Sequence, residues 1–435
     1  MALGLIIALI VLVLLTVPVG AIVVVMGMML AEVSGRSRFI GVIGEIFWEQ
    51  GNGFILLSVP LFILLGEIML RSGIATRMYS AVAKWTSWLP GGLMHANIGA
   101  SALFAATSGS SVATVATIGT VAYPEIKKRG YHEGIFLGSL AAGGTLGILI
   151  PPSVAMIIYG VMTNTSVPDL YLAGIIPGIV LALMFSIMIL GLCLLRPSWG
   201  GEQVSASWGA RLRALVDLAP PMAVFGAVVG SIYTGLATPT EAASLGVCVA
   251  LGLAALFRTL TLKMLLLAFE RTMLTSAMIL FIVYASLFFN FILGFSGITQ
   301  QLLSGFSKLA LSPALTLTVL VIFYLVLGMF VETLSMILLT LPIVFPIVMN
   351  LHVPGYSDVW FGIIIVILME MALITPPVGL NLFVAQGIRT GGGSFSDIAL
   401  GSLPFVIPML GLVFILMLFP QLAIWLPDLV KARPG

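Results

Sequence analysis

Residues 92–125 read GLMHANIGASALFAATSGSSVATVATIGTVAYPE, and this stretch decides the fold. It is apolar except for an interruption at 107–111, which consists of glycine and hydroxyl residues. Each arm is shorter than the roughly 20 residues that a helix needs to cross a bilayer. The segment therefore predicts a re-entrant helical hairpin, which enters the membrane and leaves it on the same side. A second such hairpin is predicted at 314–348, with its interruption, GMFVETLS, at 328–335.

The composition of the rest of the chain also indicates a membrane protein. The 435 residues are 60% apolar and only 8% charged, whereas roughly a quarter of the residues in soluble domains are charged. Runs almost free of charge lie at 2–30, 54–70, 134–163, 170–195, 218–237, 240–257, 272–295, 314–331, 359–388 and 399–427. We expect an all-α polytopic membrane protein with several transmembrane helices, some of them broken.

Landmark residues recur in the same order in two halves of the chain, at an offset of roughly 221 to 228 residues. The matching landmarks are Pro18 and Pro239, Ser72-Gly73-Ile74 and Ser296-Gly297-Ile298, Tyr123-Pro124 and Phe345-Pro346, Pro151-Pro152 and Pro376-Pro377, and Asp169 and Asp397. The predicted organisation is a first repeat at 1–195, a cytoplasmic linker at 196–217, an extra transmembrane helix at 218–237 and a second repeat at 238–435.

The distribution of basic residues predicts how the repeats are oriented. With a cytoplasmic N-terminus and a periplasmic C-terminus, thirteen of the 18 Lys and Arg residues fall on the inside. This agrees with the positive-inside rule, which the reverse topology would violate. Five crossings then separate equivalent points, so the second copy is inverted, as in many secondary transporters.

The helix interruptions are the predicted binding sites. A helix that restarts after Ser110 or Thr333 directs free N–H groups and a positive dipole end at the break, which favours an anion. Double prolines free backbone carbonyls one turn earlier. Together with Thr145, Thr375 and Asn381 these carbonyls supply hard oxygen ligands suited to an alkali cation. The alternatives are close helix packing by small residues and simple proline kinks.

Glu332, at the second interruption, has two interpretations, because it can attract a cation or cap the helix that follows. For Glu67, Glu241 and Glu370 we expect structural hydrogen bonds. The sequence has no H-E-x-x-H, Walker A or G-x-S-x-G motif, so we expect a protein that is not an enzyme. Without a nucleotide site, transport has to draw on an ion gradient.

Several motifs resemble the large (M) membrane subunit of tripartite ATP-independent periplasmic (TRAP) transporters over essentially the whole chain. The motifs are VPLFILLGEIM (59–69), ATSGSSVATVATIG (106–119), GTLGILIPPS (144–153), ATPTEAA (237–243), GMFVETLSMILLTLPI (328–343) and ITPPVGLNLFV (374–384).

This resemblance implies an importer of an organic acid in a bacterial or archaeal inner membrane. It implies elevator motion, coupling to two or more Na⁺ ions, and two partners: a small four-helix membrane subunit (Q) and a periplasmic substrate-binding protein (P). The sodium ligands that it implies are Ser108, Ser110, Gly144, Thr145, Gly328, Glu332 and Thr375. The substrate contacts that we predict are Ser110, Ser111, Thr145, Thr333, Ser335 and Asn381.

Three other functions share some of these features. A stand-alone sodium- or proton-coupled carboxylate carrier would need no binding protein. An intramembrane hydrolase would need one of the serines at 108–111 paired with a base, and no histidine or lysine is predicted at that depth. A passive channel does not require duplicated hairpins. The substrate itself, whether a C4-dicarboxylate, sugar acid, keto acid or sialic acid, is left open.

Overall fold

The structure is a computed structural model that describes residues 12, 15, 17–203, 206–309, 311–329 and 331–432. Most of the first half of the predicted helix 2–30, and Phe330 in the second interruption, lie outside the described residues. Within the described part all regular elements are helices, and one isolated β-bridge joins Tyr131 and Gly200. Six of these helices are long and apolar enough to cross a membrane, or seven if one bent pair is a single span. The predicted all-α class with several apolar helices is confirmed.

The first half of the chain contains ten described α-helices. They are α2 (Val19–Val33), α3 (Ile43–Gly51), α4 (Ser58–Arg71), α5 (Ile74–Thr86), α6 (Gly92–Ser108), α7 (Ser111–Ala122), α8 (Pro124–Arg129), α9 (Glu133–Leu149), α10 (Val154–Thr163) and α11 (Val167–Leu195). The segment predicted as the first hairpin forms α6 and α7, with a break at Gly109 and Ser110. The run 134–163 forms α9 and α10, which meet at an angle of 43° around the double proline.

The second half has the same kinds of element. The helices are α12 (Trp208–Ala214), α13 (Ala219–Tyr233), α14 (Pro239–Leu256), α15 (Leu262–Ser296), α16 (Ile298–Leu309), α17 (Pro313–Gly328), α18 (Thr333–Met349), α19 (Asp358–Leu373), α20 (Leu380–Ile388), α21 (Phe395–Leu418) and α22 (Gln421–Lys431). The segment predicted as the second hairpin forms α17 and α18. The predicted linker 196–217 includes the short helix α12, which the Trp85 indole N–H ties to α5 through the Arg211 carbonyl (3.1 Å).

Hydroxyl side chains decide where many of these helices begin. A serine or threonine accepts a hydrogen bond from a backbone N–H in the first turn and so satisfies one of the donors that a helix start leaves free. Helices α7, α10, α11, α12, α14, α15, α17, α19 and α21 are capped in this way by Ser110, Ser153, Ser166, Ser207, Thr238, Thr261, Ser312, Ser357 and Ser394. Capping residues in the sequence therefore mark where these helices begin.

Local structure is duplicated at one pair of equivalent landmarks. Ser72 donates to the carbonyl of Met69 and accepts from the N–H of Ile74. Ser296 donates to the carbonyl three residues before it and accepts from the N–H two residues after it in the same way. The glycine that follows each serine has a positive φ, 73° at Gly73 and 76° at Gly297. The same short sequence therefore ends an apolar helix and begins an amphipathic one in both halves.

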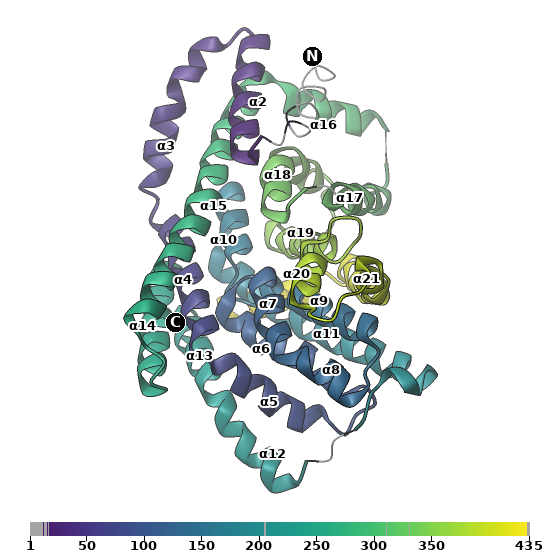
Figure 1. Ribbon diagram of the computed structural model, residues 1–435. Coiled ribbons are helices and arrows are strands. Elements are labelled where there is room, and N and C mark those ends of the chain that lie inside the picture. The colour runs from purple at the N-terminus through teal and green to yellow at the C-terminus, as the bar shows by residue number, and fades with distance from the viewer. Residues whose placement is uncertain are drawn as a thin grey trace.

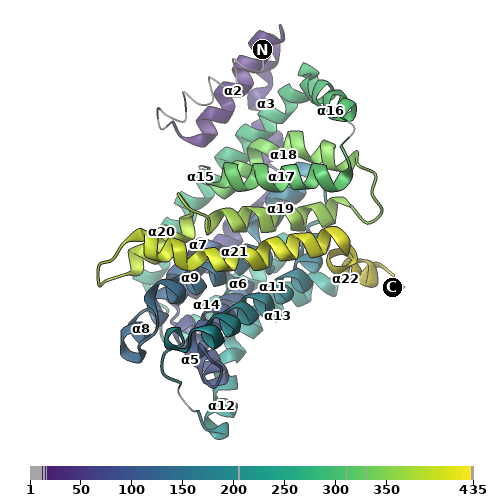
Figure 2. The same ribbon diagram turned by 90° about the vertical axis from the view of Figure 1, so that its right-hand side faces the viewer.

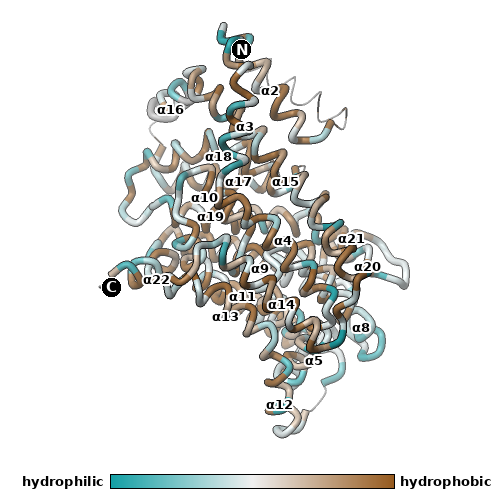
Figure 3. Tube along the Cα trace, turned by 90° about the vertical axis from the view of Figure 1, so that its left-hand side faces the viewer, coloured by the Kyte–Doolittle hydropathy of each residue, from teal (hydrophilic) through white to brown (hydrophobic). Residues whose placement is uncertain are grey.

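Helix α15, with 35 residues, runs along one side of the molecule beside α2 and α4 (Figure 1). Apolar colour follows the bodies of α4 and α14, and polar colour is stronger at α8 and α22 (Figure 3). Large apolar side chains on the outer faces are exposed, for example Leu183 (59%) on α11 and Met273 (71%) on α15. Such surfaces suit lipid rather than water, so the chain is a multi-pass membrane protein.

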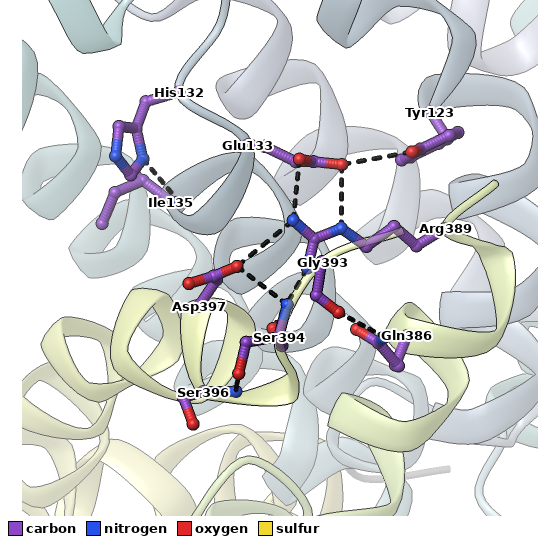
Figure 4. A network of polar contacts seen from close by, with 10 residues as sticks. All are labelled: Tyr123, His132, Glu133, Ile135, Gln386, Arg389, Gly393, Ser394, Ser396 and Asp397. Carbon is purple, nitrogen blue, oxygen red and sulfur yellow. Dashed lines mark hydrogen bonds and ion pairs between the residues drawn. The ribbon is translucent and has the colours of Figure 1, made fainter. Parts of the chain in front are cut away.

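Helices α6 and α7 form the first helix pair, and α17 and α18 form the second; the open end of each pair is the end opposite its break. The two open ends lie at opposite ends of α21, whose 24 residues span about 36 Å. At the start of α21, Arg389 contacts Glu133 (2.8 Å), which also accepts from the hydroxyl of Tyr123 at the end of α7 (3.1 Å; Figure 4). At the other end, the hydroxyl of Tyr356, in the loop after α18, donates to the carbonyl of Met417 (3.0 Å). Figure 2 shows α8 and α22 at opposite edges of the molecule.

The two broken helices run in opposite directions between these ends. Helix α9 begins at Glu133, beside the residue that follows α20. Helix α10 ends near the start of α19, where the Tyr159 hydroxyl donates to the carbonyl of Asp358 (2.7 Å). The breaks between α9 and α10 and between α19 and α20 therefore lie between the two ends of α21.

Candidate functional site

The first break is a short turn between α6 and α7. Gly109 has a φ of 60°, a left-handed conformation that suits glycine. Ser110 caps α7 by accepting from the N–H of Ala113 (3.4 Å). The Ser108 hydroxyl is hydrogen-bonded to the hydroxyl of Thr114 (3.0 Å). The start of α7 thus has a neutral serine cap, and no carboxylate among the described residues accepts from the backbone N–H groups of its first turn, where the helix dipole is positive.

Glycines bring the first break against the broken helix α9–α10. A Cβ on Gly109 would lie 2.9 Å from the carbonyl oxygen of Pro152. On α9, a Cβ on Gly147 would lie 2.8 Å from the carbonyl oxygen of Ser110, and one on Gly144 would lie 2.1 Å from a methyl carbon of Val115. Only glycine permits this approach, so the backbone of the first break and the double proline form one site.

Two further predicted residues, Thr145 and Asn381, differ in whether their polar atoms already have hydrogen-bond partners. The buried hydroxyl of Thr145 donates to the Ala142 carbonyl of its own helix (2.6 Å). The side-chain amide of Asn381, at the start of α20, donates to the carbonyl of Ala141 (3.1 Å). Its carbonyl oxygen Oδ1 is buried and has no hydrogen-bond partner. Asn381 therefore brings an unused oxygen close to α9, whereas the hydroxyl hydrogen of Thr145 is already committed.

Ser111 connects the first break to α19. Its hydroxyl lies 2.7 Å from each of the two carboxyl oxygens of Glu370. Glu370 is completely buried. The expected structural hydrogen bond of this glutamate is present, but its partner at the first break was not predicted. The signal that could have found it is an ionisable residue within a long apolar run, which marks a functional candidate in membrane proteins.

The second break is organised by Glu332. Its carboxylate accepts from the N–H groups of Leu334 (3.1 Å) and Ser335 (3.0 Å), and from the hydroxyls of Thr333 (3.2 Å) and Ser335 (3.0 Å). Glu332 is therefore the cap of α18, one of its two predicted roles. The expectation of free N–H groups does not hold here, because this carboxylate already satisfies those of Leu334 and Ser335. Its negative charge favours a cation at this break.

Helix α19 lies between the two breaks. Glu370 contacts Ser111 at the first, while a Cβ on Gly328 at the second would lie 2.1 Å from the Cβ of Ala372. Two residues along a helix are about 200° apart, so these contacts are on nearly opposite faces. Thr375, just beyond α19, donates its hydroxyl to the carbonyl of Met371 (2.7 Å) and its N–H to that of Ala372.

The structure gathers the predicted residues into two groups. The group at the first break contains Ser108, Ser110, Ser111, Gly144 and Asn381, with Thr145 next to it on α9. The group at the second break contains Gly328, Glu332, Thr333 and Ser335, with Thr375 one turn from Ala372. The first group combines the positive end of α7 with one unpaired oxygen, Oδ1 of Asn381. The second combines the Glu332 carboxylate with the backbone at the start of α18.

This arrangement of paired breaks can be compared with known proteins. A sequence profile described as "Tripartite ATP-independent periplasmic transporter, DctM component" matches residues 6–422. The chain belongs to this family. It is 34% identical over 396 residues to the C4-dicarboxylate TRAP transporter large permease protein DctM of Pseudomonas aeruginosa, with 88% of each chain covered. It is 33% identical to the ectoine/5-hydroxyectoine TRAP transporter large permease protein UehC of Ruegeria pomeroyi, with 87% of each covered.

The fold of this DctM-family chain also resembles a solved structure. The YdaH transporter of Alcanivorax borkumensis superposes with a TM-score of 0.62 over 91% of this chain and 89% of that one. The sequence identity is 14%, so this likeness concerns the fold alone. The resemblance to TRAP transporters that the sequence motifs indicated is confirmed.

Proposed function

We propose that this chain is the large permease subunit of a sodium-coupled secondary transporter that imports an organic acid across the inner membrane. One observation supports this proposal most strongly. Two interrupted helix pairs, whose open ends lie at opposite ends of α21, place their breaks on opposite faces of α19. Symmetric, discontinuous helices that meet between the two membrane surfaces are the usual construction of a substrate site in secondary transporters.

Sodium binds at the two breaks in this proposal. At the first, the candidate ligands are Ser108, Ser110, Gly144 and Thr145, and at the second they are Gly328, Glu332 and Thr375. Glu332 lowers the electrostatic cost of a cation because its carboxylate is half-buried at the second break. The hydroxyl hydrogen of Thr145 is committed to Ala142, but its oxygen keeps lone pairs for a cation.

The organic acid binds at the start of α7. The neutral cap there leaves the positive helix end available for a carboxylate, whereas Glu332 occupies the equivalent position of α18. The candidate contacts at this break are Ser110, Ser111, Thr145 and Asn381, while the other two candidates, Thr333 and Ser335, lie at the second break beside Glu332. Because its relatives are named for C4-dicarboxylates and for ectoine, family membership alone does not select one substrate.

Coupling to sodium supplies enough energy for accumulation. A tenfold sodium gradient provides about 1.4 kcal/mol per ion. A membrane potential of 100 mV adds about 2.3 kcal/mol for each net charge that moves. Two sodium ions with a dicarboxylate move no net charge, so a third ion or a singly charged substrate is needed for the potential to contribute.

The chain works with two partners in this proposal, a small four-helix membrane subunit and a periplasmic binding protein that delivers the substrate. The N-terminus is cytoplasmic, the C-terminus is periplasmic, and the parts with the two breaks move as an elevator against α15 and its neighbours. The repeated local structure at Ser72 and Ser296 supports the inverted repeat on which such motion depends.

The direct test is uptake by proteoliposomes that contain the chain and its small subunit, with the binding protein and a labelled organic acid outside. We expect uptake when sodium is present at a higher concentration outside, and none with lithium, potassium or a proton gradient alone. Uptake that is unchanged after sodium is replaced would contradict sodium coupling. Uptake by the chain alone, without either partner, would favour a stand-alone carrier.

A further inference from the structure

Glu370 is a buried acid without a basic partner. It lies in α19, where every residue from Val359 to Leu373 is buried, and its own exposure is 0%. Among the described residues, its side-chain hydrogen bonds are the two with the Ser111 hydroxyl. No lysine, arginine or histidine among the described residues forms an ion pair with it. A carboxyl group in this position requires another source of neutrality.

No charged side chain on the elements packed around α19 supplies one through an ion pair among the described residues. Helices α7, α18 and α20 contain no titratable residue. The titratable groups on α19 itself, and on or directly flanking the other elements in contact with it, are Tyr123, His132, Glu133, Tyr159, Asp169, Tyr171, Cys193, Arg196, Tyr324, Glu332, Asp358, Arg389, Asp397, Asp428 and Lys431. None of them has a recorded hydrogen bond or ion pair with Glu370. Among the described residues, the polar side chain that contacts Glu370 is therefore that of Ser111.

An ionised carboxylate that is buried among apolar side chains with one hydroxyl donor carries a large desolvation cost. A proton removes that charge and lets the carboxyl group both donate and accept. The distance of 2.7 Å from the serine oxygen to each carboxyl oxygen fits a hydrogen bond in either direction. One serine hydroxyl and two carboxyl oxygens are few ligands for an alkali ion, but a proton needs only the carboxyl group.

We propose that Glu370 is a proton-binding site, and that its proton keeps Ser111 and the first break docked on α19. Loss of the proton would leave a buried, unpaired negative charge beside the substrate contacts of α7. The first break would then separate from α19, and organic-acid binding would weaken at alkaline pH. The last consequence rests on the proposed transport function, whereas the presence of the proton does not.

The proton can be observed in the purified protein without substrate or sodium. A protonated carboxylic acid has a carbonyl stretching band in the infrared that a carboxylate lacks. We expect a band at neutral pH in the wild type that is lost in Glu370→Gln and is shifted in Ser111→Ala, which removes the hydrogen bond but keeps the acid. Glu67→Gln is the matched control, because Glu67 is paired with Arg71 on α4 and should not contribute to the band.

Three results would overturn this site. They are a wild-type spectrum without a band that Glu370→Gln or Ser111→Ala alters, a band that Glu67→Gln removes, and a band that disappears when sodium is added at constant pH. The last would assign an alkali cation to Glu370. Because these spectra need no transport, they distinguish failure of this site from failure of the proposed function.

Uptake as a function of pH tests the consequence. The wild type is expected to lose uptake as the pH rises, and Glu370→Gln, which resembles the protonated form, is expected to keep uptake with a flatter profile. Glu370→Ala, which leaves Ser111 unpaired, should reduce uptake by about tenfold or more at every pH. A merely structural glutamate would give Glu370→Gln the same pH profile as the wild type, and that result would contradict the docking role.

Discussion

Single residues determine how closely the first break approaches its neighbours. Gly147 faces the backbone of Ser110 and Ser111 at 2.8 and 2.9 Å, measured from the position that a Cβ would take. A flexible side chain could turn aside, but a helix start cannot move without disturbing its cap. Gly147, like Gly109 and Gly144, therefore fixes the geometry of the candidate site although it contributes no polar side chain.

Gly147→Ala is expected to lower the free energy of unfolding by about 1–3 kcal/mol, because the added methyl group pushes α7 away from α9. Sodium-driven uptake should decrease with it. Thermal unfolding in detergent and uptake in proteoliposomes measure both effects. Gly191→Ala is the matched control, since nothing lies within 4 Å of its added Cβ. An equal effect of the two substitutions would contradict the close contact at the first break.

Glu332 combines a cap with a charge, and two substitutions separate these roles. Glu332→Ala should lower stability by about 0.5–2 kcal/mol through loss of the cap, and should also reduce the rise in melting temperature that sodium produces. Glu332→Asp keeps a residue that is favoured at helix starts together with its charge, so it should remain closer to the wild type. A full sodium response in Glu332→Ala would mean that Glu332 caps α18 without taking part in sodium binding.

At the residue scale, the polar character of the breaks could be predicted from the sequence, but the partners of individual atoms could not. Hydroxyls and glycine at 107–111 indicated the first interruption because they divide an otherwise apolar run into two arms that are too short to span a bilayer. The contact of Ser111 with Glu370 joins residues far apart in the chain. Such a pairing depends on tertiary packing, which periodicity and composition do not specify.

At the scale of elements, an ion-pair cluster joins three helix ends. Arg389 follows α20, its side chain is 5% exposed, and it contacts Glu133 at the start of α9 and Asp397 at the start of α21 (Figure 4). Hydrogen bonding to Glu133 raises the pKa of Arg389 above its ordinary value, so the guanidinium stays charged. Through Tyr123 and Glu133, the cluster connects the end of α7 to the end of the broken helix α19–α20.

Arg389→Ala should destabilise this end by about 1–3 kcal/mol, because two charge-assisted hydrogen bonds to Glu133 are lost. Arg389→Lys keeps the charge but not the two-pronged geometry, and should fall between the wild type and the alanine variant. Lys128→Ala removes an exposed ion pair with Glu125 and should cost about 0–1 kcal/mol. Melting temperatures of the four proteins in one detergent test this order, and similar values for both alanine variants would contradict it.

Element boundaries followed from the sequence where prolines and caps mark them, as at the two double prolines. Expectations were less accurate where several short apolar elements share one run. The run 399–427 forms two helices, α21 and α22, that meet near Pro420. Helix α12 lies in a polar stretch whose composition indicates a linker, and its contact with Trp85 comes from packing rather than from local pattern.

At the scale of the whole molecule, the proposed transport function depends on two interrupted helix pairs that open toward opposite sides of the membrane. The repeat of landmarks predicted this inversion from sequence order and charge alone. In the structure, the Tyr123–Glu133–Arg389 contacts and the Tyr356–Met417 contact place the two open ends at opposite ends of α21. Family membership agrees with transport but says nothing about this geometry by itself.

The most direct test is the sidedness of two single cysteines in a chain with Cys193→Ser and Cys248→Ser. Lys128→Cys lies on α8, beside the first open end, and His352→Cys lies in the exposed loop at the second. With a membrane-impermeant maleimide, we predict that Lys128→Cys is labelled only from the cytoplasmic side and His352→Cys only from the periplasmic side. Labelling of both cysteines from the same side would contradict the inverted arrangement of the two helix pairs.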